Sequence, residues 1–404
     1  RAARAFFRSS IRPGELEGRI RFRVQGYKKS PPNSSSDGVM ASKPSSASPI
    51  LCASFNQDNS CFAIGARDGF RIFDAATGRL CYERSLGAFS IVEMLFSTSL
   101  LAVVGAGEQP SLSPRRLCLF NTANGTTRKE LNFLTSILAV RLNRKRLIVI
   151  LQEKTYIYDL NSLAILDTID TVPNPKGLCA FSPSSEGGYL ALPASRTKGS
   201  VLIYNTVELF SLCQIDAHQK PLAAIAFSSN GMYMATASEQ GTIIRVHLVS
   251  QATKSYSFRR GTYPSMIYSI SFGPSMDFPD TLVATSSSGS VHIFSLESIL
   301  NQSRPTGLLG SMIPDSINGA LESAHHHVLH NAVPRGVKSH LIIHSVDKVV
   351  STVQTAASVR LSIFIVDQGG YLREYTVNIS QSKELSWSLE RELNLLLTDS
   401  DIRY

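Results

Sequence analysis

The sequence of 404 residues has no apolar run long enough for a transmembrane helix, which needs about 20 consecutive apolar residues. It also lacks closely spaced cysteines: all six lie between Cys52 and Cys213, and no Cys-x-x-Cys pair occurs. Each cysteine is in or beside an apolar run, a pattern typical of buried free thiols and unlike a disulfide framework or zinc site. We therefore expect free cysteines in a reducing, cytoplasmic compartment.

Motifs that carry catalysis are missing as well. The chain has no Gly-x-Ser-x-Gly, His-Glu-x-x-His or P-loop sequence, and no pair of carboxylates stands out. His325, His326, His327 and His330 could ligate a metal, but they lack cysteine or carboxylate partners at ligand spacing. A pH-sensitive contact of these histidines with anionic lipid is the favoured alternative. We expect a binding protein that is not an enzyme and needs neither cofactor nor metal.

Excess positive charge is scarce outside the N-terminal 39 residues. The net charge is +9, and residues 1–39 account for +6 of it. The nearly neutral remainder argues against nucleic-acid binding. Residues 1–48 are Arg-rich and then Ser/Pro-rich, which predicts a disordered arm. Met40 is the first methionine and a candidate for the natural start, while the acid-poor composition also fits a transit peptide.

A repeated plan begins at Ile50, in which an apolar strand and a tight turn lead into a second strand that ends at a marker pair of residues. The markers recur every 38–47 residues, close to the length of a four-stranded propeller blade, until a last interval of 81. With no Trp-Asp signature, this predicts an all-β, seven-bladed β-propeller of divergent WD-repeat type over residues 49–380, followed by a C-terminal segment, 381–404. The markers are Phe73-Asp74, Phe120-Asn121, Tyr158-Asp159, Tyr204-Asn205, His247-Leu248, Phe294-Ser295 and Tyr375-Thr376.

The long last interval places a loop insertion in blade six, over residues 297–335. Its apolar residues recur at three- and four-residue steps and would form one face of a helix, although Pro314 and Gly319 weaken such a helix in water. Insertion into a membrane interface and docking of a flexible loop on its own blade both fit this pattern. The apolar positions are Leu308, Leu309, Met312, Ile313, Ile317 and Leu321.

Two adjacent arginines, Arg259 and Arg260, lie between two stretches of similar plan. In an extended backbone their side chains would point to opposite sides and serve two pockets. Guanidinium, hydroxyl and imidazole groups together suit phosphate, although a solvated turn and a structural role for His218 are alternatives. We predict a first pocket of His218, Ser238, Thr242, Arg245 and Arg259, and a second of Arg260, Ser286, Ser290 and His292.

The string Tyr-Ser-Phe-Arg-Arg-Gly-Thr-Tyr at 256–263 resembles the signature of the PROPPIN family of phosphoinositide-binding β-propellers. The segments 52–58 and 217–223 are similar to that family too, and the resemblance runs from about 51 to 300 and resumes near 361. It implies that the two predicted pockets bind phosphoinositide head groups. Ser290 stands where the family usually has threonine and Ser287 where an acidic residue is frequent; Ser290 keeps the hydroxyl.

The resemblance also implies roles for two loops. The blade-six insertion of PROPPINs enters the bilayer, which favours membrane insertion of residues 297–335. A Pro-Arg stretch in blade two of the family holds autophagy partners, and its counterpart here is Pro114, Arg115 and Arg116. A solvated hairpin loop is the alternative for this basic run.

The function expected from the resemblance is that of an autophagy effector. It would bind phosphatidylinositol 3-phosphate, and also the 3,5-bisphosphate, as a peripheral protein of preautophagosomal, vacuolar or endosomal membranes. Autophagy scaffold or lipid-transfer proteins would dock on blade two. The alternatives are a general WD-repeat scaffold that binds only proteins and, more remotely, a nucleic-acid-associated or organellar protein addressed by the basic arm.

Overall fold

The computed structural model describes residues 49–184, 188–274, 281–296, 326–350, 357–380 and 384–397. The arm expected over residues 1–48, including Met40, lies outside the described residues. The positions predicted to insert into a membrane lie outside them as well: Leu308, Leu309, Met312, Ile313, Ile317 and Leu321. No helix in the described ranges is long and apolar enough to cross a membrane.

The described residues form seven four-stranded antiparallel sheets, each built from consecutive strands. Blades one to four are β1 (Ile50–Phe55), β2 (Cys61–Ala66), β3 (Phe70–Asp74), β4 (Leu80–Arg84); β5 (Phe89–Met94), β6 (Leu100–Gly105), β7 (Arg116–Asn121), β8 (Thr126–Asn132); β9 (Ala139–Leu142), β10 (Arg146–Ile150), β11 (Lys154–Asp159), β12 (Ile165–Asp170); and β13 (Ala180–Phe181), β14 (Tyr189–Pro193), β15 (Gly199–Asn205), β16 (Phe210–His218). Blades five to seven are β17 (Leu222–Phe227), β18 (Tyr233–Ser238), β19 (Ile243–Leu248), β20 (Gln251–Arg259); β21 (Ile267–Phe272), β22 (Thr281–Ser286), β23 (Val291–Ser295), β24 (His326–Leu329); and β25 (Ser339–Val350), β26 (Ala357–Asp367), β27 (Tyr371–Ile379), β28 (Leu385–Asn394).

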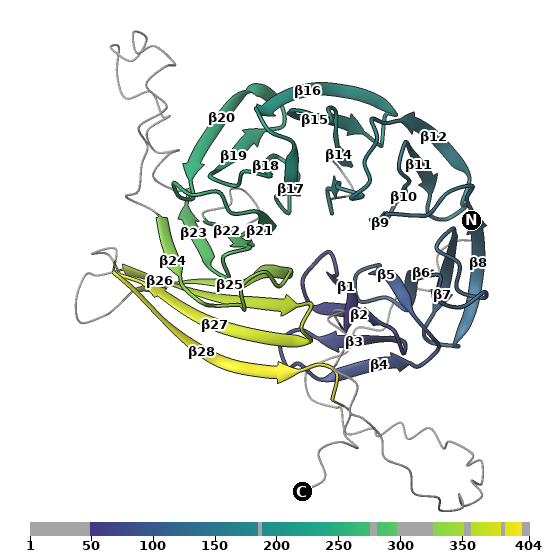
Figure 1. The fold of residues 1–404 in the computed structure, drawn as a ribbon, viewed down its shortest axis with the longest axis horizontal. Helices are drawn as coiled ribbons and strands as arrows, with labels where there is room; N and C mark the ends of the chain where they lie inside the picture. Colours follow the sequence, from purple (N-terminus) through teal and green to yellow (C-terminus); the bar gives the residue numbers. More distant parts are fainter. Residues whose placement is uncertain are drawn as a thin grey trace, which may run out of the picture. The chain divides into compact units, whose positions relative to one another are not determined.

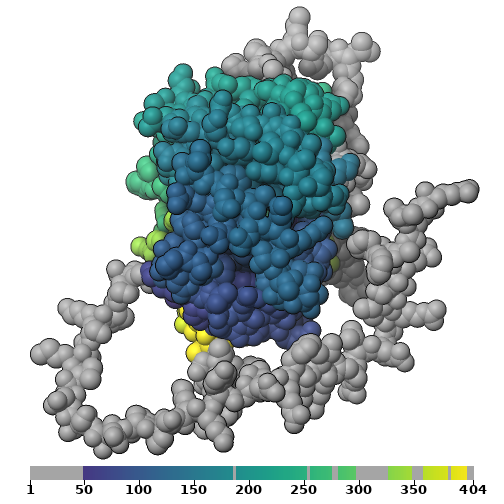
Figure 2. All heavy atoms as spheres, turned by 90° about the vertical axis from the view of Figure 1, so that its right-hand side faces the viewer, coloured from purple at the N-terminus to yellow at the C-terminus, as the bar shows by residue number. Residues whose placement is uncertain are grey.

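The sheets lie in a ring in chain order, with the first strand of most blades near the centre and the fourth at the circumference (Figure 1). Seen from the side, blades one to four form a continuous surface that runs from purple through blue to teal (Figure 2). The predicted seven-bladed β-propeller is therefore confirmed.

An apolar cluster fills each junction between neighbouring blades. β10 shows why: Leu147 and Val149 face blade two, while Ile148 and Ile150 face blade four, and all four side chains are fully buried. A strand buried on both faces must be apolar throughout, although its side chains still alternate in direction. This burial accounts for the uninterrupted apolar runs in the sequence.

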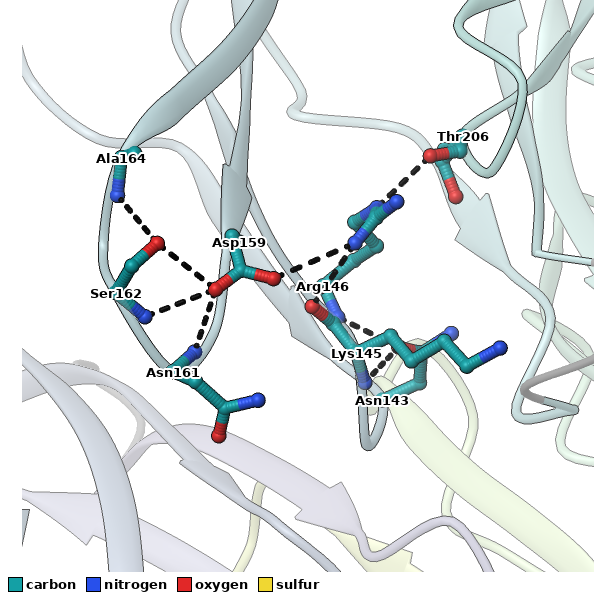
Figure 3. A network of polar contacts seen from close by, with 8 residues as sticks. All are labelled: Asn143, Lys145, Arg146, Asp159, Asn161, Ser162, Ala164 and Thr206. Atoms are coloured by element: carbon teal, nitrogen blue, oxygen red, sulfur yellow. Dashed lines mark hydrogen bonds and ion pairs between the residues drawn. The ribbon is translucent and has the colours of Figure 1, made fainter.

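The polar residue of a marker pair fixes the turn between the third and fourth strands of a blade. In blade three, Oδ1 of Asp159 accepts hydrogen bonds from the backbone N–H of Ser162 (2.8 Å) and from its hydroxyl (2.9 Å) (Figure 3). Arg146 pairs with the other carboxylate oxygen at 3.6 Å and donates from Nε to the carbonyl oxygen of Thr206 in blade four at 2.8 Å. Asp159 thus shapes the turn and also pairs with Arg146, which bonds the next blade.

The ring closes between blades seven and one without an exchanged strand, since β1–β4 and β25–β28 each form a complete sheet. Phe364 and Leu372 of blade seven pack with Ile50 and Phe62 of blade one. Arg391 in β28 also donates from Nη2 to the carbonyl oxygen of Ala76 at 2.9 Å. Closure therefore depends on packing and on side-chain hydrogen bonds.

Two boundaries differ from those expected from the sequence. The fourth strand of blade seven, β28, lies beyond residue 380, so the propeller continues into the expected C-terminal segment. The fourth strand of blade six, β24, lies inside the expected insertion and pairs with β23, placing His326 opposite Phe294. Both are outermost strands with largely half-buried or exposed side chains, so they carry a weak apolar signal.

Candidate functional site

The two predicted arginines lie where blade five passes into blade six. Arg259 is the exposed last residue of β20 and pairs with Ile243 of β19. The backbone N–H of Arg260 then donates to the carbonyl oxygen of Thr242 at 2.8 Å, which anchors the chain after the strand. The arginines are therefore held by the turn between β18 and β19, which contains Gly241.

The guanidinium group of Arg260 is fixed by two carbonyl oxygens. Nε donates to Gly241 at 2.8 Å and Nη2 donates to Tyr263, using two of the five N–H groups of the side chain. Burial lowers the pKa of Arg260 from its usual value, and its charge contributes to lowering the pKa of His292 and His326 in blade six. Arg260 is thus oriented by blade five and close to blade six.

The structure places three of the four residues of the second predicted pocket at one end of blade six. Ser286, Ser290 and His292 are buried at and beyond the turn between β22 and β23, and the charge of Arg260 contributes to lowering the pKa of His292. The hydroxyl of Ser286 lies 2.8 Å from that of Ser288 and donates to the carbonyl oxygen of Ser290 at 3.4 Å. These hydroxyls already have protein partners, so their contribution to a ligand depends on a rotation of the O–H bond.

His292 has one bonded and one unbonded ring nitrogen. Nδ1 lies 3.0 Å from Nε2 of His326, whereas Nε2 is buried without a hydrogen-bond partner. Burial lowers the pKa of His292 to about 3, with contributions from His326, Arg260 and His330. The ring is therefore neutral at pH 7, and one of its nitrogens is unsatisfied. His292 was predicted from the sequence, but its bond to His326 in β24 was not.

The first predicted pocket contains a chain of hydrogen bonds that the sequence did not reveal. Nε2 of His218 lies 3.0 Å from the hydroxyl of Thr236, which lies 3.2 Å from Nε2 of His247. Arg245 donates from Nη1 to the carbonyl oxygen of Ala217 and from Nε to the hydroxyl of Ser257 at 3.3 Å. His218 thus bonds a strand of the next blade, which is a structural role.

The first predicted pocket combines a neutral histidine with a positive charge. Burial lowers the pKa of His218 to about 4, and the charge of Arg245 adds to this effect. Ser238 is buried at the end of β18, and Thr242 is half-buried beyond the turn. The neighbouring carboxylate of Glu239 pairs with Lys176, so its negative charge is neutralised.

Gly241 sets the close approach of the two blades. Its φ is +61°, and a Cβ there would lie 1.9 Å from the carbonyl oxygen of Ser265. The backbone N–H of Ser265 donates to Gln240 at 3.1 Å, and the Ser265 hydroxyl lies 3.0 Å from that of Ser287. The turn of blade five is thereby linked to the turn of blade six, between the two predicted pockets.

The basic run of blade two is only partly exposed. Arg116 pairs with Glu130 across β7 and β8 at 3.6 Å, and its Nε is buried without a hydrogen-bond partner, so this side chain lies against its own blade. Arg115 is exposed, and its carbonyl oxygen accepts from the N–H of Phe133 at 2.9 Å. Pro114 likewise accepts from Ile137 at 2.8 Å. Close in sequence to Phe133, Leu134 is 92% exposed, so an apolar side chain accompanies the exposed arginine.

Within the part of the chain that the structure describes, no group of three His, Cys, Asp or Glu side chains is arranged to hold a metal ion. The six cysteines are unpaired. His326 and His327 lie in β24.

Comparisons with known proteins agree with this architecture. The chain is 64% identical to autophagy-related protein 18b of Arabidopsis thaliana over 360 residues, covering 88% of this chain and 98% of the relative. It is 38% identical to autophagy-related protein 18 of Dictyostelium discoideum over 312 residues, covering 72% and 82%. Hsv2 of Kluyveromyces lactis superposes with a TM-score of 0.69 at 18% identity over 86% of this chain and all of Hsv2.

A complex of KlAtg21 with the coiled-coil of AgAtg16 provides a further structure of this fold. It superposes with a TM-score of 0.64 at 24% identity, over 86% of this chain and 99% of that one. The family model described as PROPPIN matches residues 49–383, which span all but the last strand of the propeller. The chain therefore belongs to the PROPPIN family and is a relative of autophagy-related protein 18.

Proposed function

We propose that this protein binds phosphatidylinositol 3-phosphate, and the 3,5-bisphosphate, on membranes through the two pockets at blades five and six. The observation that carries the proposal is the fixed guanidinium of Arg260, whose charge lowers the pKa of His292, together with the unpartnered Nε2 of that histidine. Arg260 keeps N–H groups that can meet phosphate oxygens, and a neutral imidazole can donate one more hydrogen bond. Such donors suit a phosphorylated head group.

Two pockets on one rigid body would bind a membrane far better than either pocket alone. Occupation of the first pocket makes binding at the second intramolecular, which raises the overall affinity by about 10²-fold or more. The first pocket comprises His218, Ser238, Thr242, Arg245 and Arg259; the second comprises Arg260, Ser286, Ser290 and His292.

The insertion of blade six would add hydrophobic binding. Burial of three of its large apolar side chains contributes roughly 4–8 kcal/mol before ordering costs. The proposed inserting residues are Leu308, Leu309, Met312, Ile313 and Ile317. Lipid recognition together with insertion makes a reversible peripheral protein of preautophagosomal, vacuolar or endosomal membranes.

Blade two supplies the proposed protein-docking surface. Arg115 is exposed beside Leu134, and this pairing of a cation with an apolar side chain suits a protein partner. The complex of KlAtg21 with the coiled-coil of AgAtg16 supports protein docking on propellers of this fold. The proposed role is that of an autophagy scaffold without enzymatic activity.

Liposome flotation tests the lipid proposal. The wild type and Arg259→Thr/Arg260→Thr are compared on vesicles with and without phosphatidylinositol 3-phosphate. Arg128→Thr/Lys129→Thr is a matched control, because it removes the same charge from the exposed strand β8 of blade two. We expect lipid-dependent flotation of the wild type and the control only, with all three folded by circular dichroism. Equal flotation of all three proteins would contradict the two-pocket proposal, and no lipid-dependent flotation of the wild type would favour the protein-only scaffold.

A further inference from the structure

We infer that His326 is a positioning residue for the second pocket: it donates from Nε2 to Nδ1 of His292 and so holds His292 in the tautomer that presents an N–H to an anion. This inference rests on the proposed function and adds a residue of β24 to the site. His326 would not touch the ligand. It would act through His292.

The geometry fixes His326 firmly against its partner. Nε2 of His326 lies 3.0 Å from Nδ1 of His292, and the two rings are stacked at 5.2 Å between centroids with an interplanar angle of 23°. The other neighbour of His326 is Phe294, with centroids 4.5 Å apart and planes within 8° of parallel. Phe294 is 1% exposed, so it gives the His326 ring a fixed surface to pack on.

Both imidazoles are neutral at pH 7. Burial lowers the pKa of His292 to about 3 and that of His326 to about 4, and Arg260, His327 and His330 are the further charged or titratable groups that act on this pair. A neutral imidazole carries one N–H and one lone pair. The contact between the rings therefore contains a single proton, which belongs either to His292 or to His326.

The two arrangements differ at the far side of His292. If His292 donates from Nδ1, its Nε2 carries a lone pair, which repels a phosphate oxygen. If His326 donates from Nε2, then Nε2 of His292 carries the N–H and can donate to that oxygen. Phosphate oxygens only accept hydrogen bonds when ionised, so an anion beside Arg260 selects the second arrangement.

The unsatisfied nitrogen distinguishes this role from simple packing. His292 is only 4% exposed, and its Nε2 is buried without a hydrogen-bond partner. Leaving a buried polar atom unpaired is unfavourable unless the atom serves a ligand. Packing alone would be provided equally well by a second phenylalanine at position 326.

Substitutions at His326 separate hydrogen bonding from packing. His326→Phe keeps a ring on Phe294 but removes the donor, whereas His326→Gln keeps an amide donor and removes the ring. Both are made in the Arg259→Thr background, so that vesicle binding reports the second pocket. We expect about tenfold weaker binding of His326→Phe to vesicles with phosphatidylinositol 3-phosphate, the effect of one lost hydrogen bond, and less than about threefold weakening for His326→Gln.

A double-mutant cycle and a spectroscopic readout complete the test. With Arg259 intact, so that the first pocket still binds, His326→Phe added to Arg260→Thr should weaken vesicle binding by less than about twofold, because the two residues act on one bound group. Nitrogen-15 NMR with the soluble head group inositol 1,3-bisphosphate should show Nε2 of His292 protonated in the wild type and in His326→Gln, and a mixture of tautomers in His326→Phe.

Equal binding by His326→Phe and the wild type, or equal losses in the Phe and Gln variants, would overturn the inference. If Arg260→Thr weakens binding while His326→Phe does not, the proposed function stands and the inference alone fails. If Arg259→Thr/Arg260→Thr binds like the wild type, the proposed function fails, and the role of His326 fails with it.

Discussion

Nε of Arg260 donates to the carbonyl oxygen of Gly241 over 2.8 Å, so an arginine at the start of one inter-blade connection is oriented by a tight turn of the preceding blade. A second bond, from Nη2 to the carbonyl oxygen of Tyr263, holds the same guanidinium. The group is thereby oriented before any ligand arrives, which reduces the entropy lost on binding.

This orientation predicts that Arg260→Lys fails to replace arginine, although it preserves the charge. A lysine ammonium lacks the planar fork that bonds backbone carbonyls and an anion together. We expect about tenfold weaker binding to vesicles with phosphatidylinositol 3-phosphate, as for one lost charge-assisted hydrogen bond. The control Arg128→Lys, in β8, should bind as the wild type does. Full binding by Arg260→Lys would show that charge alone suffices.

A second prediction concerns Gly241. Gly241→Ala places a Cβ 1.9 Å from the carbonyl oxygen of Ser265, at a φ of +61°. The control Gly125→Ala has a similar φ of +68° but no atom within 4 Å of the new Cβ, so it carries backbone strain alone, about 1–2 kcal/mol. Gly241→Ala should lose more unfolding free energy in urea and should weaken vesicle binding, because Ser265 must move. Equal losses in the two variants would contradict this.

A third prediction concerns the buried ion pairs of blade seven. Arg373 donates to Asp367 and, from Nε, to Glu392 at 2.6 Å, and Asp367 is 1% exposed. Arg373→Met leaves the Asp367 carboxylate buried and unpaired, which should cost about 3–5 kcal/mol of unfolding free energy. Trp387 in β28 is the only tryptophan, so its fluorescence reports the unfolding of this blade.

A double variant tests whether the stability lost in Arg373→Met comes from the unpaired charge of Asp367. Arg373→Met/Asp367→Asn replaces the unpaired carboxylate by a neutral amide and should recover part of the lost stability. A double variant as unstable as the single one would show that Arg373 acts through packing.

A fourth prediction concerns acid stability. Burial lowers the pKa values of His218 and His247 to about 4 and that of His292 to about 3, well below the unfolded value near 6.5. Below pH 6.5 the unfolded chain takes up protons that the folded protein excludes, so stability falls with pH until about pH 4. Above pH 7 both states are neutral, and these groups add no pH dependence.

Calorimetry at a series of pH values measures this effect. The Tm should be nearly level from pH 8 to 7 and should fall between pH 6.5 and 4. In His292→Gln the fall should be shallower, because the largest of the three shifts is removed. A Tm that stays level down to pH 4.5 would be incompatible with buried neutral histidines.

The blades were predictable because their middle strands are buried on both faces. The run from Leu147 to Ile150 is apolar at every position, and each such run marks one blade. The outermost strands β24 and β28 gave no comparable signal, since much of their surface faces solvent. The expected boundaries at residues 335 and 380 failed at these two strands.

The residues of the candidate site could be predicted from their types and spacing, but the contacts that orient them could not. Arginine, serine and histidine at spaced positions indicated phosphate, and the structure places Arg260 near His292. The carbonyl groups that orient Arg260 leave no trace in a sequence, because every residue has one. His326 was expected to contact lipid, and its bond to His292 was not predicted, since the two lie 34 residues apart and become neighbours only through the pairing of β23 with β24.

Because the ring closes without strand exchange, the chain ends could lie between any two blades without changing the order of the blades around the ring. All four strands of each blade are consecutive, so a cut between β4 and β5 would leave every sheet intact. A circular permutant that begins at blade two and carries a linker from blade seven to blade one would keep the same inter-blade packing. The proposed lipid pockets and the proposed docking loop would then be presented on a chain with new ends.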